Sequence, residues 1–90
     1  MIYTVEFSPR ALKSLKKMNT RISANLLAWI KRNLDGCQNP RAHGKALTAD
    51  LSGLWRYRIG NYRIIAEISD STVTVIVLEV GHRSIIYKKR

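Results

Sequence analysis

The centre of the chain holds two alternating apolar and polar runs that are separated by two turn residues. Residues 54–59 and 62–68 alternate, and the Gly-Asn pair 60–61 lies between them. Gly-Asn between two such runs is typical of a two-residue β-hairpin loop, and this loop length fixes the register of the strands. The register places Arg58 directly opposite Arg63. This part of the chain is therefore expected to form an antiparallel sheet.

The Arg58–Arg63 pair is unfavourable by itself, because like charges directly opposite each other destabilise a strand pair. An anion between the two guanidinium groups reverses that effect, since guanidinium groups match phosphate oxygens. The whole chain also carries a net charge of +10, from 16 Lys and Arg against 6 Asp and Glu. Such a charge indicates a polyanionic partner, most often a nucleic acid. We therefore expect the arginine pair to contact phosphate.

The first third of the chain predicts one strand followed by two helices. Residues 3–7 alternate as in a half-buried strand. Ser8 is a good N-cap residue, and Pro9 suits the first position of a helix. Apolar residues then recur at helical spacing on either side of a break at 18–20, up to Gly36, which suits a helix C-terminus. The two helices are expected to form an α-hairpin.

The second half of the chain predicts the rest of a sheet. Residues 37–51 contain Pro and Gly without a periodic pattern and are expected to be irregular. Residues 73–80, which follow the hairpin, are apolar at nearly every position, as in a central strand covered on both faces. The element order is then β-α-α-β-β-β within a single domain, residues 1–90. We expect an α+β fold of two layers, in which the N-terminal strand and the helical hairpin pack on a mostly antiparallel four-stranded sheet.

The hairpin divides its side chains between two faces. One face is apolar and is expected to form the floor under the helices: Trp55, Tyr57, Ile59, Tyr62, Ile64, Ala66 and Ile68. The other face carries Arg56, Arg58 and Arg63, and no remaining element is expected to cover it. Neighbouring segments are expected to add Lys45, His82, Arg83 and Tyr87 to this face. Guanidinium groups that converge on a phosphodiester stabilise the charge that grows on it during displacement.

Other classes of site and location are disfavoured by the composition. Cys37 is the only cysteine, which excludes an intramolecular disulfide and a multi-cysteine metal site. The acids are few and scattered, without the spacing of metal ligands, so neither a metal nor a cofactor is expected. The N-terminus lacks the pattern of a signal peptide, and no run reaches the roughly 18 apolar residues of a membrane span. We expect a cytoplasmic protein that does not enter a membrane.

Three segments together resemble one protein family. They are residues 3–12 (YTVEFSPRAL), residues 54–63 (LWRYRIGNYR), and residues 80–83 (VGHR) with Tyr87. In these segments the sequence resembles the RelE/ParE superfamily of bacterial toxin–antitoxin toxins, and the RelE ribonuclease branch more than the ParE branch. The resemblance spans nearly the whole chain. It implies the same β-α-α-β-β-β fold that the periodicity predicts.

The resemblance also implies an activity and roles for individual residues. Toxins of the RelE branch enter the ribosomal A site and cut messenger RNA there without a metal. The ribose 2′-OH attacks the adjacent phosphate and leaves a cyclic phosphate and a free 5′-OH. Arg63 and Arg83 match the arginines that stabilise the transition state, and Tyr87 matches a tyrosine that orients the substrate. Arg56 and Arg58 stand where the best-known member has lysines.

This departure from the family pattern leaves the proton acceptor open. Lysine can lose a proton when its environment favours the neutral form, whereas arginine effectively cannot. His82 is the first candidate, because imidazole exchanges protons near neutral pH. Lys45 is the second candidate, and Glu67 and Glu79 follow. Basic residues expected to bind RNA are Arg56, Lys45, Lys88 and Lys89.

The family implies a partner that silences the basic surface. This partner is a cognate antitoxin, acidic or amphipathic, which forms a hetero-oligomer with the toxin and contacts operator DNA through a part of its own. Two other functions remain open. A ParE-type toxin would inhibit DNA gyrase without being an enzyme, and a noncatalytic basic protein would bind single-stranded RNA. Cut message in a translation extract supports the ribonuclease, and stalled gyrase–DNA complexes support the ParE-type inhibitor. Harmless overexpression supports the noncatalytic RNA-binding protein.

Overall fold

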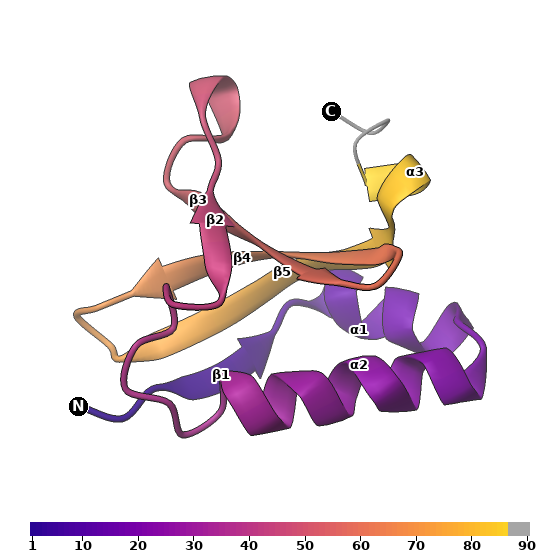
Figure 1. Cartoon of the computed structure of the whole chain (residues 1–90), viewed down its shortest axis with the longest axis horizontal. Coiled ribbons are helices and arrows are strands. Elements are labelled where there is room, and N and C mark those ends of the chain that lie inside the picture. The colour runs from indigo at the N-terminus through magenta and orange to yellow at the C-terminus, as the bar shows by residue number, and fades with distance from the viewer. Residues whose placement is uncertain (87–90) are drawn as a thin grey trace.

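In a computed structural model of the chain, the described residues are 1–86, and they form one sheet with helices around it. The elements are β1 (Thr4–Phe7), α1 (Pro9–Lys17), α2 (Thr20–Asn33), β2 (Gly44–Ala46), a short 3₁₀ helix η1 (Ala49–Leu51), β3 (Leu54–Ile59), β4 (Tyr62–Ser69), β5 (Thr74–His82) and α3 (Arg83–Ile86). Helices α1 and α2 lie on one side of the sheet (Figure 1). The predicted two-layer α+β architecture is confirmed.

The sheet has five strands where four were expected, in the order β1-β5-β4-β3-β2. Strand β1 runs parallel to β5, and the other neighbours are antiparallel. The additional strand, β2, lies within residues 37–51, which were expected to be irregular. Its 3 residues are too few to show a period of two. Gly44 lets it approach β3, since a Cβ there would lie 2.8 Å from Tyr57 Cε1.

The hairpin has the predicted register. Arg58 pairs with Arg63, and Ile59 pairs with Tyr62 on either side of the turn. Gly60 has φ = +58°, a left-handed conformation that glycine adopts without strain. The two-residue loop therefore sets the strand pairing as the sequence indicates.

The core lies between the sheet and the helices. The apolar hairpin face faces this core: Tyr57, Ile64 and Ala66 are fully buried, and Trp55, Ile59, Tyr62 and Ile68 pack around them. Helix α1 begins at the predicted cap, where Ser8 Oγ accepts from Ala11 N at 3.0 Å. The same hydroxyl donates to Leu78 O at 2.8 Å, which ties the helix to β5.

A bulge interrupts the pairing of β4 with β5. Near the turn between them, Ser69 pairs with Thr74 and Ala66 pairs with Val77, but the next residue of β4, Ile65, pairs with Glu79. Leu78 is thus an extra residue in β5. Such a residue moves every later side chain of its strand to the opposite face relative to the partner strand.

The C-terminal segment folds back over the face that was expected to stay open. The N–H of Arg83 donates to Asn61 O at 2.8 Å, so α3 begins against the hairpin turn. Ile86 is buried and packs over Gly81, where an added Cβ would lie 3.1 Å from Ile86 Cδ1. Helix α3 and the arm formed by β2, η1 and β3 both lie on the side of the sheet away from α2 (Figure 1). Among residues 1–86, no helix has the length and apolar character needed to span a membrane.

Candidate functional site

Two arginines and a glycine form one row across three strands. Arg58 of β3 pairs with Arg63 of β4, which pairs with Gly81 of β5. The side chains of this row point away from α2, because the neighbouring residues of each strand face the core. Arg83 follows two residues after Gly81, and its backbone is held by Asn61 of the turn. Three of the predicted arginines therefore meet around a single hairpin turn.

The three arginines differ in exposure. Arg63 is only 5% exposed, and its Nη1 donates to Gly60 O at 3.0 Å and to Tyr62 O at 2.9 Å. Its Nε is buried and has no hydrogen-bond partner in the structure of residues 1–86. Arg58 and Arg83 are exposed. The expectation of an open row of guanidinium groups is thus corrected: Arg63 is buried, and its guanidinium group holds two backbone carbonyls at the turn.

A second basic cluster lies beside Arg58, along the edge formed by β2. Lys45 pairs with Arg56, so both side chains lie on the same face. A hollow of about 260 Å³ is lined by Ala42, His43, Gly44, Lys45, Arg56 and Arg58. The structure places Lys45 beside two of the hairpin arginines, Arg56 and Arg58. The sequence interpretation missed His43, because β2 was not expected, and the proximity of residue 43 to β3 follows only from that strand.

His82 does not join the arginines. It pairs with Tyr62, a residue of the core-facing side, and the two rings meet edge to face with centroids 5.5 Å apart. Its Nδ1 accepts from Ser84 N at 3.1 Å, so in the neutral ring the proton lies on Nε2. The physical reason is the bulge at Leu78. If Leu78 paired with Ile65 in a regular register, His82 would share a face with Arg63.

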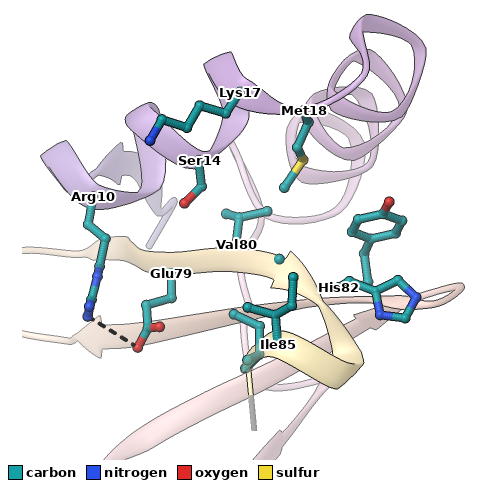
Figure 2. Close-up of a pocket in the computed structure, with 11 residues that line it drawn as sticks. Arg10, Ser14, Lys17, Met18, Glu79, Val80, His82 and Ile85 are labelled. Carbon is teal, nitrogen blue, oxygen red and sulfur yellow. Dashed lines mark ion pairs between the residues drawn. The ribbon is translucent and has the colours of Figure 1, made fainter. Parts of the chain in front are cut away.

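Instead, His82 lines a groove of about 300 Å³ between α1, the end of β5 and α3. Figure 2 shows Arg10, Ser14 and Lys17 of α1, with Met18 just after its end, facing Val80, His82 and Ile85 across this groove. Its lining is mostly apolar, and Arg10 and Lys17 supply cations at its α1 side. Glu79 is 5% exposed and forms an ion pair with Arg10 at 3.8 Å.

The loop before β2 is anchored at two points. The hydroxyl of Tyr57 donates to Pro40 O at 2.6 Å, and burial raises the pKa of this tyrosine to about 12. Arg41 forms two hydrogen bonds with Asp70, at 3.2 and 2.9 Å, while Tyr3 Oη donates to Asp70 at 2.6 Å. The hydrogen bond from Arg41, followed by that from Tyr3, lowers the pKa of Asp70. Arg41 is therefore engaged in this anchor and does not belong to the basic face.

The described residues contain no group of three His, Cys, Asp or Glu residues that could hold a metal ion. Cys37 is half-buried, and burial raises the pKa of its thiol, which disfavours the reactive thiolate. Tyr87, Lys88 and Lys89 lie outside the described residues, so their roles stay predictions.

The arrangement favours binding of a phosphodiester. Arg58 and Arg83 are exposed, Arg63 is buried at the same hairpin turn, and Lys45 and Arg56 extend the surface along β2 and β3. Donors of this kind bind phosphate oxygens and stabilise negative charge that develops on them. None of the arginines can accept a proton.

Comparison with known proteins gives consistent matches over almost the entire chain. Residues 5–87 match the family described as ParE toxin of type II toxin–antitoxin system, parDE. Toxin RelG of Mycobacterium tuberculosis is 36% identical over 89 residues, which cover 99% of this chain and 100% of that toxin. Toxin RelE of the same organism is 30% identical, with 96% and 87% of the two chains covered. A chain in the crystal structure of the toxin–antitoxin complex RelBE2 from M. tuberculosis superposes with a TM-score of 0.84 at 34% identity, covering 93% of this chain and 94% of that one.

Proposed function

The chain belongs to the RelE/ParE family of toxins of type II toxin–antitoxin systems, and from this we propose that it cuts messenger RNA in the ribosomal A site in the cytoplasm. Two relatives carry RelG and RelE names, which favours the ribonuclease branch. The observation that carries the proposal is the gathering of Arg58, Arg63 and Arg83 around one hairpin turn.

The reaction is an attack by a ribose 2′-oxygen on the neighbouring phosphate. The O2′–P bond forms, the P–O5′ bond breaks, and the products are a cyclic phosphate and a 5′-OH. Arg58 and Arg83 contact the phosphate oxygens that gain charge, since they are the exposed guanidinium groups of the row. Arg63 holds the turn carbonyls and adds its positive charge. Lys45 and Arg56 bind the adjoining RNA backbone, with Lys88 and Lys89 adding charge, and Tyr87 orients the substrate.

The test is single-turnover cleavage of a message on programmed ribosomes, with cut ends mapped by primer extension. Arg83→Ala and Arg58→Ala are each expected to slow cleavage about 100-fold, the usual cost of removing one donor to a developing oxyanion. Arg32→Ala, which removes an exposed arginine of α2, is the matched control and should cleave at the wild-type rate. Equal rates for all three variants would overturn the assignment of this face.

A second candidate function is favoured by one observation, which is that the matching family is described as ParE toxin. A gyrase inhibitor would leave the message intact and would cause stalled gyrase–DNA complexes to accumulate. A noncatalytic RNA-binding protein would do neither and would not arrest growth. The same purified protein added to a translation reaction and to a gyrase supercoiling reaction separates these outcomes.

We further infer that the cognate antitoxin, an acidic and amphipathic partner, occupies the groove between α1 and α3. The apolar lining suits an apolar anchor, and Arg10 and Lys17 suit acidic flanks (Figure 2). Any operator binding would come from the antitoxin. Lys17→Glu should weaken neutralisation by the antitoxin in a growth assay, whereas Lys13→Glu, an equal charge change on α1 away from the groove, should not. Equal neutralisation of the two variants would refute this docking site.

A further inference from the structure

The hollow beside the arginine row is lined by a histidine as well as by cations. His43 lines this hollow together with Lys45, Arg56 and Arg58. We propose that His43 is the catalytic residue that accepts the proton of the attacking 2′-OH. The inference rests on the proposed ribonuclease function and assigns the proton acceptor of that same site.

The other candidates for this role are poorly placed. Arginine effectively cannot lose its proton, and Lys45 would accept one only in its neutral form, because an ammonium group has no lone pair. His82 lies on the opposite side of the sheet, and its Nδ1 already accepts the N–H of Ser84. Glu67 lies four residues along β4 from Arg63, which corresponds to roughly 13 Å of strand.

His43 is both accessible and held in place. Its side chain is exposed, and its ring meets the edge of the Trp29 ring with centroids 6.2 Å apart and planes at 80°. The loop that carries it is fixed by the Tyr57–Pro40 hydrogen bond, three residues earlier. His43 therefore lies on an anchored loop, and it lines the same hollow as the cations that would hold the phosphate.

Among residues 1–86, the charged side chains that line the hollow with His43 are all cationic. Lys45 comes from β2, Arg56 and Arg58 come from β3, and α2 presents the uncharged ring of Trp29. A substrate phosphodiester would be drawn to these cations, which brings the ribose of the preceding nucleotide toward the imidazole. Within the described residues 1–86, no carboxylate lines this hollow.

The step balances with the substrate and solvent alone. A neutral imidazole nitrogen takes the 2′-OH proton as the O2′–P bond forms and the P–O5′ bond breaks. The departing 5′-oxygen takes a proton from water, and the imidazolium returns its proton to the hydroxide left behind. The sum is an intramolecular transesterification, which converts one phosphodiester into a cyclic phosphate and an alcohol with no oxidant, reductant or co-substrate.

The experiment is single-turnover cleavage on programmed ribosomes as a function of pH, with wild type, His43→Ala, His43→Gln and His82→Ala. Both His43 variants should lose about 100-fold in rate, within the range for general acid–base catalysis, while ribosome affinity stays unchanged. The fall in rate at acidic pH that the wild type shows should be flattened in both His43 variants. Added imidazole should restore part of the His43→Ala rate but none of the His43→Gln rate. Thermal unfolding of each variant checks that its fold is intact.

Two results would overturn the proposal in distinguishable ways. Cleavage by His43→Ala at the wild-type rate, or a loss confined to His82→Ala, would remove His43 from the reaction and leave the ribonuclease function standing. Failure of the wild-type protein to cut any message, together with intact ribosome binding, would overturn the proposed function and this inference with it.

Discussion

Removal of the Tyr57 hydroxyl is the sharpest test of how the basic hollow is supported. In Tyr57→Phe the ring remains, so no cavity forms, but Pro40 O loses the donor that lies 2.6 Å away. Both residues are fully buried, which keeps water from replacing the hydroxyl. A buried carbonyl left without a donor costs about 1–3 kcal/mol. We expect a loss of about 2 kcal/mol, which in a domain of this size lowers Tm by about 8–16 °C.

Urea unfolding followed by the fluorescence of Trp29 and Trp55 measures this loss. The control is Tyr62→Phe, which removes a hydroxyl from a half-buried ring and should change stability by less than about 0.5 kcal/mol. The slope of the unfolding free energy against urea should be the same for both variants, since neither changes the surface exposed on unfolding. Equal midpoints for Tyr57→Phe and Tyr62→Phe would refute the argument that the loop is anchored through Pro40.

The same residue predicts an alkaline dependence. The pKa of Tyr57 rises from an ordinary 10.0 to about 12 on folding, so the fold favours the neutral phenol. Its contribution to stability is complete below pH 10 and is lost as pH rises through 12. The stability advantage of the wild-type protein over Tyr57→Phe should therefore shrink across this interval. A stability difference between the wild type and Tyr57→Phe that grows with pH would contradict the expected direction.

Three further substitutions test the surrounding structure. Asp70→Asn should destabilise the protein at neutral pH, because it removes the ion pair with Arg41. Since folding lowers the pKa of Asp70, the stability difference between this variant and the wild type should vanish as pH falls through the folded-state pKa. A stability difference that persists in acid would count against the ion pair. Gly44→Ala would place a methyl group 2.8 Å from Tyr57 Cε1 and 3.0 Å from Arg56 O. The clash should cost about 1–3 kcal/mol of stability and weaken RNA binding through Lys45. Unfolding and filter-binding measurements on Ala46→Ser, a change on the same strand, should show neither effect. Arg63→Lys keeps the positive charge but loses the guanidinium contacts with Gly60 O and Tyr62 O. Thermal unfolding should show a stability loss of about 1 kcal/mol for Arg63→Lys and no such loss for Arg58→Lys. Identical unfolding transitions for the two variants would mean that those contacts are dispensable.

Local sequence patterns predicted the parts of the fold that depend on neighbours along the chain. The Gly-Asn loop gave the Arg58–Arg63 pairing, and Ser8 with Pro9 gave the start of α1. Strand β2 was missed because three residues carry no visible period, and its pairing with β3 depends on the close approach that Gly44 allows. Pairing of this kind is a property of two segments together.

The sequence indicated where Arg58 and Arg63 lie, but it did not indicate where His82 lies. The hairpin register alone brings Arg58 and Arg63 together. Arg63 is buried beside Gly81, over which Ile86 of α3 packs, and the placement of His82 depends on the bulge in β5. Neither feature has a local signal, because an apolar strand such as residues 73–80 looks the same with or without one extra residue.

The extra residue in β5 has a consequence for how this protein should be compared with its relatives. A regular register, in which Leu78 paired with Ile65, would leave the sequence unchanged. It would turn His82 to the face of Arg63 and turn Gly81 away from that face. A relative of the same length without the bulge would align with no gap and yet present different side chains on this face. A relative that lacks residue 78 would keep Gly81 opposite Arg63 and His82 opposite Tyr62. The register of this strand beyond the bulge therefore determines the chemistry of the site as directly as the identity of the residues in it.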